Sequence, residues 1–221
     1  MNIFIPILEK CALFQGVSSE DIQKMLRCFG ARIAHFGKYQ FLFSEGDEAR
    51  YVGIVLTGGV RLVKEDYDGK SSIISLAGPG ELFCESFACA DVAALPVGVE
   101  AAENSAVVLI DSRRITSICA NACGCHSKVL NNLLRVVASR NLEYHHKMEI
   151  TAKRTTREKL MAYLLAQSKA AGSNTFTIPF DRQALADYLQ VERSAMSTEI
   201  GKLRDDGVLI TRRSEFTLLL P

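Results

Sequence analysis

The stretch FDRQALADYLQVERSAMSTEIGKLRDDGVLI, residues 180–210, decides how the C-terminal part of this chain folds. Asp181 is the expected N-cap of a helix, because a carboxylate there accepts hydrogen bonds from the free amides of the first turn. Leu185 and Leu189 follow at helical spacing, and the helical pattern breaks at residues 190–192. The pattern predicts two short helices joined by a tight turn.

The second helix is expected to start at Arg193 and to bury Met196, Ile200 and Leu203, which recur at spacings of four and three. Gly207 is expected to end it, since glycine readily adopts the left-handed conformation of a helix C-terminus. The opposite face offers hydroxyl and cationic side chains, which suit base edges and phosphates. The candidate DNA-binding residues are Arg193, Ser194, Ser197 and Thr198 for base edges or adjacent phosphates, and Lys202, Arg212 and Arg213 for phosphates.

Two short apolar runs, Val208–Ile210 and Phe216–Leu220, enclose the basic segment Thr211–Ser214. This order predicts a β-hairpin, or wing, after the helix pair. The alternative is an ordinary helical hairpin with a solvated polar face, which apolar spacing alone does not exclude. Gln190 fits the first interpretation least well, because the turn often needs a positive φ, which favours glycine.

Length and composition favour two domains in a soluble globular protein, with 221 residues, 48% hydrophobic and 23% charged. The net charge of +1 hides an asymmetry of about −2 over residues 1–150 and about +3 over residues 151–221. With no apolar run of membrane-spanning length and no signal-peptide pattern, we expect a cytoplasmic protein without a membrane partner. Seven cysteines, an odd number, favour thiols, metal binding or redox use over a disulfide framework.

Short β-rich runs separated by glycines follow two expected N-terminal helices, Ile3–Phe14 and Ser19–Phe29. Many short strands at regular spacing predict a closed β-roll or barrel. The expected strands are Ile33–Phe36, Phe41–Phe43, Tyr51–Thr57, Gly59–Glu65, Ser71–Ala77, Val97–Ala102 and Ala106–Ile110.

Helical patterns return after Asp111, with a short helix at Ser112–Ala122 and a long one at His126–Thr151. One apolar row is expected to pack on the roll and the other on a partner helix, which predicts a homodimer. The alternative is a long helix that packs only on its own domain. The partner row is Leu130, Leu134, Val137, Asn141, Tyr144 and Met148, and the second row is Val129, Leu133, Val136 and Arg140. A helix at Arg157–Ala170 and a strand at Thr175–Pro179 are expected to lead into the helix pair.

The segments GPGELFCESFA (Gly78–Ala88), REKLMAYLL (Arg157–Leu165) and the stretch quoted first give the chain, over nearly its whole length, a resemblance to the CRP/FNR family of bacterial transcription regulators. The resemblance implies an α+β chain with an N-terminal double-stranded β-helix, or jelly roll, of the cyclic-nucleotide-binding type at residues 1–125. A dimerisation helix at residues 126–152 and a winged helix–turn–helix domain at residues 153–221 follow.

The family also implies a homodimer whose effector binds in the roll and repositions the DNA-binding domains. The two recognition helices would lie about 34 Å apart and read an inverted repeat of double-stranded DNA. RNA polymerase is a candidate further partner. Family members typically place Glu and Arg on the recognition helix where this chain has Ser194 and Thr198, so its operator is expected to differ from that of the cyclic-AMP regulator.

The ligand motif departs from the family. Cyclic-nucleotide-binding members carry Gly-Glu and then Arg-Ser, and the matching positions here are Cys84–Glu85 and Leu95–Pro96. No Arg or Lys lies between Lys70 and Arg113, and a buried phosphate without a cation is costly. We therefore expect a small-molecule effector other than a cyclic nucleotide, although Glu85 has an alternative role in capping local backbone amides. The candidate effector-binding residues are Phe83, Cys84, Glu85, Ser86, Leu95, Pro96, Val97, Arg140 and Tyr144.

A rival hypothesis is a redox or gas sensor that uses haem or metal. Its candidate ligands are Cys119, Cys123, Cys125 and His126, with Cys84 and Cys89 as candidate redox thiols. Their spacing matches no standard zinc or iron–sulfur module, and buried cysteines often serve only as packing. The main interpretation therefore includes no metal and leaves the cofactor unknown.

An enzyme built on the β-roll is the minor alternative. Cys84 with Glu85 is its only suggestive pair, and the sequence lacks Gly-x-Ser-x-Gly, P-loop and His-Glu-x-x-His motifs. We therefore expect a protein that is not an enzyme.

Overall fold

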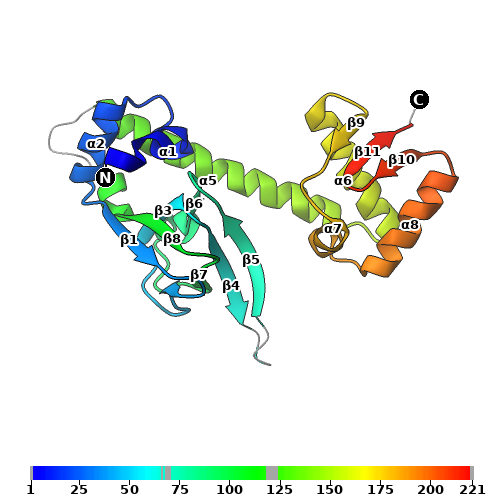
Figure 1. Cartoon of the computed structure of the whole chain (residues 1–221), viewed down its shortest axis with the longest axis horizontal. Coiled ribbons are helices and arrows are strands. Elements are labelled where there is room, and N and C mark those ends of the chain that lie inside the picture. Colours follow the sequence, from blue (N-terminus) through cyan, green and yellow to red (C-terminus); the bar gives the residue numbers. More distant parts are fainter. Residues whose placement is uncertain (1, 66, 68–70, 118–123, 220–221) are drawn as a thin grey trace. The chain divides into compact units, whose positions relative to one another are not determined.

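The computed structural model describes residues 2–65, 67, 71–117 and 124–219 (Figure 1). The chain divides into two compact units, Met1–Ser139 and Arg140–Pro221. The boundary falls within one long helix, α5 (Gly124–Thr151). No helix among the described residues combines the length and apolar content needed to cross a bilayer.

The N-terminal unit has the predicted β-roll, built on two four-stranded antiparallel sheets, and β6 is a strand that the sequence pattern did not predict. The strand orders are β1-β8-β3-β6 and β2-β7-β4-β5. The strands are β1 (Arg32–Phe36), β2 (Phe41–Phe43), β3 (Tyr51–Thr57), β4 (Val60–Glu65), β5 (Ser71–Ala77), β6 (Leu82–Phe83), β7 (Gly98–Ala101) and β8 (Ser105–Asp111).

An apolar cluster with members from both sheets forms one core of the roll, because the inward side chains of the alternating strands are valines and leucines. Val55 and Val107 come from one sheet, and Val60 and Val99 from the other. Phe83 lies against Gly53, where an added Cβ would stand 2.0 Å from the Phe83 ring. Only glycine therefore fits at residue 53.

Helices of the N-terminal unit are shorter than the sequence predicts. They are η1 (Asn2–Phe4), α1 (Ile5–Lys10), η2 (Ala12–Phe14), α2 (Ser19–Cys28), α3 (Glu85–Cys89) and α4 (Ser112–Thr116). The prediction of one helix over Ile3–Phe14 was wrong, because Cys11 is extended and interrupts it. The helix predicted at Ser112–Ala122 ends at Thr116, since Ser117 is also extended, and residues 118–122 lie outside the described part.

Helix α5 presents apolar residues on two sides. Val129 and Leu133 are buried in the core of the N-terminal unit, as predicted for the second row. Large apolar side chains on other faces stay exposed, namely Leu130, Leu134, Leu142, Tyr144 and Met148. Val137 corrects the prediction, because it is half-buried against the N-terminal core instead of standing free for a partner. Leu142, outside the predicted row, joins the exposed set.

The C-terminal unit packs helices against a three-stranded antiparallel sheet of order β10-β11-β9. Its further elements are α6 (Thr156–Ala171), β9 (Thr175–Thr177), α7 (Arg182–Leu189), α8 (Arg193–Asp205), β10 (Leu209–Arg212) and β11 (Glu215–Leu218). Thr155 and Glu158 form a reciprocal capping box at the start of α6. The predicted winged helix–turn–helix is confirmed, with α7, a turn at residues 190–192, α8 and the β10–β11 hairpin.

The tip of the wing is shorter than predicted. Thr211 and Arg212 belong to strand β10, where Arg212 pairs with Glu215. Only Arg213 and Ser214 form the turn, because the β10–β11 pairing extends as far as Arg212 and Glu215. The basic segment is therefore partly a strand, and its two arginines stand on different parts of the hairpin.

Candidate nucleic-acid interface and effector site

Helix α8 exposes the face predicted to meet DNA. Met196, Ile200 and Leu203 are buried in the core of the C-terminal unit and fix the helix orientation. The other face is exposed, and it carries Arg193, Ser194, Ser197, Thr198 and Lys202. The structure thus brings together all the candidate residues of this helix.

Two of these candidates are engaged within the helix. The Thr198 hydroxyl donates to the backbone carbonyl of Ser194 at 3.0 Å. Lys202 Nζ lies 2.7 Å from a carboxylate oxygen of Glu199, whose side chain is only 18% exposed. The Lys202 charge is therefore partly neutralised before any contact with a phosphate.

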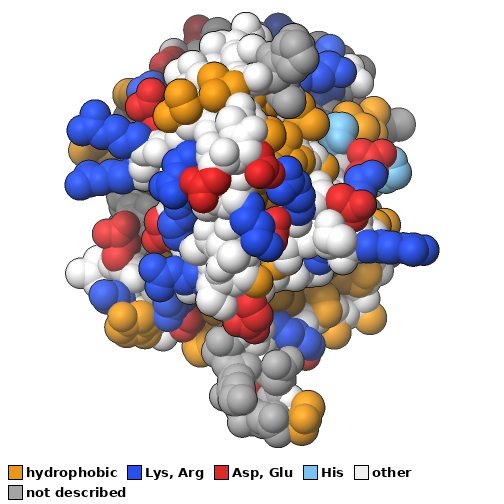
Figure 2. Space-filling model, turned by 90° about the vertical axis from the view of Figure 1, so that its right-hand side faces the viewer, with side chains coloured by type: hydrophobic (Ala, Val, Ile, Leu, Met, Phe, Trp, Pro, Cys, Tyr) orange, Lys and Arg blue, Asp and Glu red, His pale blue; other side chains and the backbone are white. Residues whose placement is uncertain are grey.

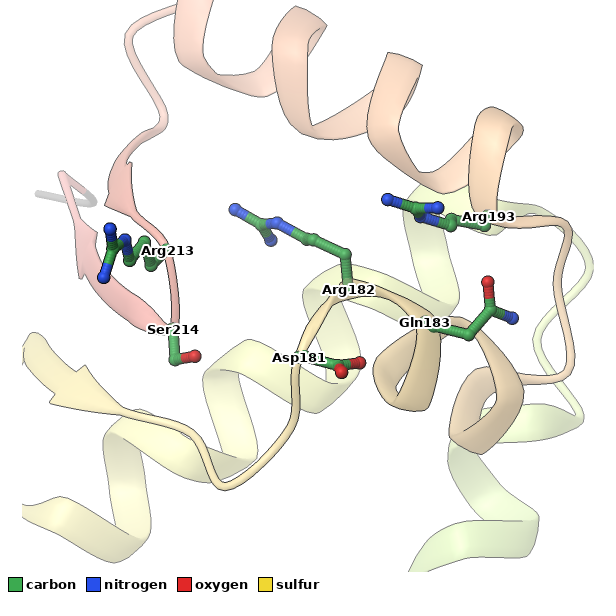
Figure 3. Close-up of a pocket in the computed structure, with 6 residues that line it drawn as sticks. All are labelled: Asp181, Arg182, Gln183, Arg193, Arg213 and Ser214. Atoms are coloured by element: carbon green, nitrogen blue, oxygen red, sulfur yellow. The ribbon is translucent and has the colours of Figure 1, made fainter.

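A pocket of about 550 Å³ opens between the starts of α7 and α8 and the wing. It is lined by Asp181, Arg182, Gln183, Arg193, Arg213 and Ser214 (Figure 3). Arg182 and Arg193 extend from the two helices into the space, and Arg213 lies on the wing at its other side (Figure 3). Three guanidinium groups against the one carboxylate of Asp181 give the lining an excess of positive charge, which suits an anion such as a phosphate.

Arg182 lines this pocket and was not among the residues predicted from the sequence. One nitrogen, Nη2, donates to the Thr211 hydroxyl at 3.0 Å, and the guanidinium lies 5.0 Å from the centroid of the Phe216 ring. Among the described residues, the other terminal nitrogen, Nη1, is buried and has no hydrogen-bond partner. Burial lowers the pKa of Arg182 from its usual value, although the group stays charged. The wing therefore holds a cation in place with one donor unused.

Helix electrostatics gave a signal that could have identified Arg182. Arg182 and Arg193 are each the first residue of a helix, and neither helix has an acidic residue in its first turn. Cations are unfavourable at a helix N-terminus, whose exposed amides carry partial positive charge. Each arginine follows an acidic N-cap residue, Asp181 or Glu192, and both arginines line the pocket.

The wing and the rest of the unit add further positive charge. Arg212 and Arg213 are exposed, and Arg213 has a positive φ of 54° in the turn. Figure 2 looks onto the C-terminal unit and shows Lys and Arg side chains spread over that face, with acidic ones between them. The surface of this unit therefore mixes both signs of charge, with a net charge of about +3 over residues 151–221.

The turn between α7 and α8 confirms that Gln190 occupies a left-handed conformation, with φ 54° and ψ 55°. A residue with a side chain lowers the free energy of unfolding by roughly 1–2 kcal/mol in this conformation, because its Cβ is strained. Glycine avoids that strain but lowers the free energy of unfolding by about 0.5–1 kcal/mol, because the unfolded chain is then more flexible. Gln190→Gly is therefore expected to raise the free energy of unfolding of the C-terminal unit by about 0.5 kcal/mol, measured by urea unfolding.

Gly207 supplies the matched control. Its φ is 69°, and an added Cβ would meet no atom within 4 Å, so only the backbone conformation is tested. Gly207→Ala is expected to destabilise by about 1 kcal/mol. Destabilisation by Gln190→Gly would show that the Gln190 side chain contributes contacts that outweigh the relief of strain.

The candidate effector residues of the roll come together in its core. Phe83, Cys84, Leu95 and Val97 belong to one buried cluster. Glu85 is buried at the start of α3, Ser86 is half-buried, and Pro96 is exposed with its carbonyl accepting from Lys64. Cys84 has a φ of 60°, so the position where the family carries glycine keeps a left-handed backbone in this chain.

Arg140 and Tyr144 lie on the part of α5 that belongs to the other unit. Arg140 is half-buried, with one guanidinium nitrogen 3.5 Å from Glu143, and the Tyr144 side chain is exposed. Their contact with an effector stays a prediction.

Three cysteines of the N-terminal unit have thiols with a raised pKa. Burial, followed by the negative charge of Glu85, raises the pKa of the Cys84 thiol to about 12. Burial also raises the pKa of Cys11 to about 11, and the pKa of Cys89 is raised by partial desolvation and by Glu85, although that side chain is exposed at the surface. The raised pKa keeps Cys84 and Cys11 protonated at neutral pH, which disfavours their reaction because the thiolate is the reactive species.

The metal candidates are only partly covered by the structure. Cys119 and Cys123 lie outside the described residues, and Cys125 is half-buried. His126 is buried, its Nε2 donates to the Ile115 carbonyl at 2.8 Å, and its ring packs edge-on against Phe29. Within the described ranges, no group of three or more His, Cys, Asp or Glu side chains is arranged to hold a metal ion.

Two protein-family models match this chain, one in each unit. A cyclic nucleotide-binding domain model matches residues 33–122, and a Crp-like helix-turn-helix domain model matches residues 158–221. The chain belongs to the CRP/FNR family. It is therefore a DNA-binding transcription regulator of that type.

Relatives of this CRP/FNR regulator span most of its length. The nitrogen fixation regulation protein FixK of Bradyrhizobium diazoefficiens is 26% identical over 86% of this chain and 79% of the relative. The cyclic AMP receptor protein of Thermus thermophilus is 26% identical over 89% of this chain and 87% of the relative. The fold is shared with the c-di-GMP responsive regulator CLP of Xanthomonas campestris, at a TM-score of 0.61 and 18% identity over 92% of this chain and all of that one.

Proposed function

We propose that this CRP/FNR regulator acts in the cytoplasm as a homodimer that binds an inverted-repeat operator, with an effector other than a cyclic nucleotide in its roll. Its parts are an effector-sensing roll at residues 1–125, a dimerisation helix at 126–152 and a DNA-binding domain at 153–221. The observation that carries the proposal is the pocket that Arg182, Arg193 and Arg213 surround beside the exposed face of α8. No catalytic step is part of it.

The DNA-contacting set that we propose extends the predicted one. Arg193, Ser194, Ser197 and Thr198 face base edges or adjacent phosphates, and Lys202, Arg212 and Arg213 face phosphates. Arg182 joins the second group, because its guanidinium lines the same pocket as those of Arg193 and Arg213. RNA polymerase stays a candidate partner.

Support for the homodimer comes from α5. Five large apolar side chains on this helix are 39–67% exposed. Exposed apolar side chains gathered on one element are typical of a protein–protein interface. Leu130, Leu134, Tyr144 and Met148 fall in the predicted heptad row. Pairing of two such rows would bury them and set the two DNA-binding units as a symmetric pair.

Support for the effector class comes from the roll. Leu95 stands where cyclic-nucleotide-binding members carry the phosphate-binding arginine, and it is buried among apolar side chains. Leu95 itself offers no charge to a cyclic phosphate, and the Lys64 ammonium next to it is already bonded to the Pro96 carbonyl and paired with Glu45. The relatives' names also point to different ligands, cyclic AMP for one and c-di-GMP for another, so family membership alone does not set the effector.

The test is operator selection followed by binding measurement. A randomised duplex library selected on the purified protein is expected to yield an inverted repeat, and fluorescence anisotropy should then show tighter binding to it than to scrambled DNA. Cyclic AMP and cyclic GMP at millimolar concentration are expected to leave the affinity unchanged. Absence of any selected sequence would contradict the DNA-binding part, and a cyclic-nucleotide-dependent gain in affinity would contradict the effector part.

Arg182→Ala is expected to weaken binding to operator and to random DNA to a similar extent, because a phosphate contact carries no sequence information. The slope of log K against log salt should become less steep by about one for each chain bound. Titrations at several salt concentrations measure both quantities.

Lys169→Ala is the control for net charge, since Lys169 is exposed in the last turn of α6 and lines no part of the pocket. An unchanged salt slope for Arg182→Ala would remove Arg182 from the phosphate-contacting set.

A further inference from the structure

The exposed face of α8 carries few side chains that form strong hydrogen bonds with base edges. In the major groove, Arg and Lys pair best with guanine, Asn and Gln with adenine, Glu and Asp with cytosine, and methyl groups with thymine. From Arg193 to Thr198 the helix offers no carboxylate and no amide side chain. Its only strong hydrogen-bonding group there is the guanidinium of Arg193.

The next acidic residue along the helix is withheld from DNA. Glu199 is largely covered, and its carboxylate is tied to Lys202 at 2.7 Å. The pair removes both a potential acceptor for cytosine and a potential donor for guanine from this part of the face. The groups left to distinguish bases beyond Arg193 are therefore hydroxyl and methyl groups.

Thr198 is the most informative of these groups. Its hydroxyl hydrogen is directed to the Ser194 carbonyl at 3.0 Å, so the side chain has no proton left to donate to a base. What remains is the γ-methyl and an oxygen lone pair on an exposed residue. A methyl group at this position suits the C5-methyl of thymine.

Small side chains around Thr198 allow the helix to approach the bases closely. Ala195 and Ser197 are exposed, and Gly201 follows Thr198 at i+3 on the same face. An added Cβ at Gly201 would meet no atom within 4 Å, so the space in front of it is open. A close approach is what a methyl–methyl contact needs, because dispersion attraction fades within a fraction of an ångström.

On the basis of the proposed DNA-binding function, we propose that α8 reads an A·T-rich half-site in which Thr198 contacts a thymine methyl and Arg193 makes the single guanine contact. Thr198 is then a specificity-determining residue that acts through its methyl group. Its hydroxyl serves only to fix the rotamer through the bond to Ser194.

The experiment removes the same contact from each side. Operators selected from a randomised library are resynthesised with uracil in place of thymine at one position at a time, which deletes one methyl group and keeps every hydrogen bond. At one thymine per half-site, uracil is expected to weaken wild-type binding about fourfold, the value of one buried methyl group. Thr198→Ser, which keeps the hydroxyl, should bind the thymine operator about fourfold per half-site more weakly and should not respond to uracil at that position.

Thr175→Ser is the matched control, because Thr175 is an exposed threonine of β9 whose hydroxyl bonds to Thr217 at 3.0 Å. It should bind as the wild type does and keep the response to uracil. Half-sites rich in G·C, or a uracil response that persists in Thr198→Ser, would overturn this inference and leave the proposed function standing. Failure to select any sequence would overturn the proposed function and this inference with it.

Discussion

Leu134→Glu in α5 is expected to convert a dimer into a monomer and to lower operator affinity more than a hundredfold. Leu134 is 67% exposed, in the predicted partner row. In a paired helix each copy would bury this side chain, a gain of about 1.5–3 kcal/mol per leucine relative to exposure. A glutamate in the same place would bury an unpaired charge in each chain, which costs several kcal/mol more.

Loss of the dimer lowers DNA affinity because the second half-site then binds as a separate molecule. Within a dimer, the first bound unit places the second at a high effective concentration over its half-site. Sedimentation velocity should give the mass of one chain for Leu134→Glu, and anisotropy on the selected operator should give its affinity.

Ser139→Glu is the control for charge and helix propensity. It adds the same side chain at an exposed position five residues further on. Because an α-helix has 3.6 residues per turn, this position lies on a different face from Leu134. It is expected to stay dimeric and to keep most of its affinity. A Leu134→Glu protein that remains a dimer would place the contact between chains elsewhere.

Arg193→Ala is expected to cost about 1–3 kcal/mol of sequence-specific binding for each half-site, a loss of roughly 5- to 150-fold. Arg193 is the first residue of α8 and one of the guanidinium groups around the pocket. A bidentate contact with guanine discriminates against every other base, so binding to random DNA should fall much less. Anisotropy on the selected operator and on a variant with the guanine replaced measures the difference.

Arg204→Ala provides the comparison within the same helix. Arg204 is exposed near the C-terminal end of α8 and pairs with Asp205 at 3.2 Å. Its removal is expected to change affinity less than twofold, as for an exposed ion pair. Equal loss on operator and on random DNA for Arg193→Ala would make Arg193 a phosphate contact.

The helix pair and the roll could be predicted because their signals are local and repeated. Leu185 and Leu189, then Met196 and Ile200, keep one helical spacing that only a buried face explains, and both pairs are in the core. Asp181 caps α7 by accepting from the Ala184 amide at 2.8 Å, as predicted. The architecture therefore follows from periodicity and capping.

Features set by contacts across the fold could not be predicted from local patterns. The role of Arg182 depends on Phe216 and Thr211, which lie about thirty residues further along the chain. Val137 keeps heptad spacing, yet the N-terminal core half-buries it. The breaks at Cys11 and Ser117 are extended residues inside sequences that carry helical patterns, where tertiary packing overrides propensity.

The central claim is that two copies of this chain read one inverted repeat together, and the mass of the complex formed on the selected operator tests it most directly. We expect sedimentation equilibrium to give two chains per duplex at every degree of saturation, with a single half-site bound far more weakly. A complex of one chain per duplex, with equal affinity for the half-site and the full repeat, would contradict it.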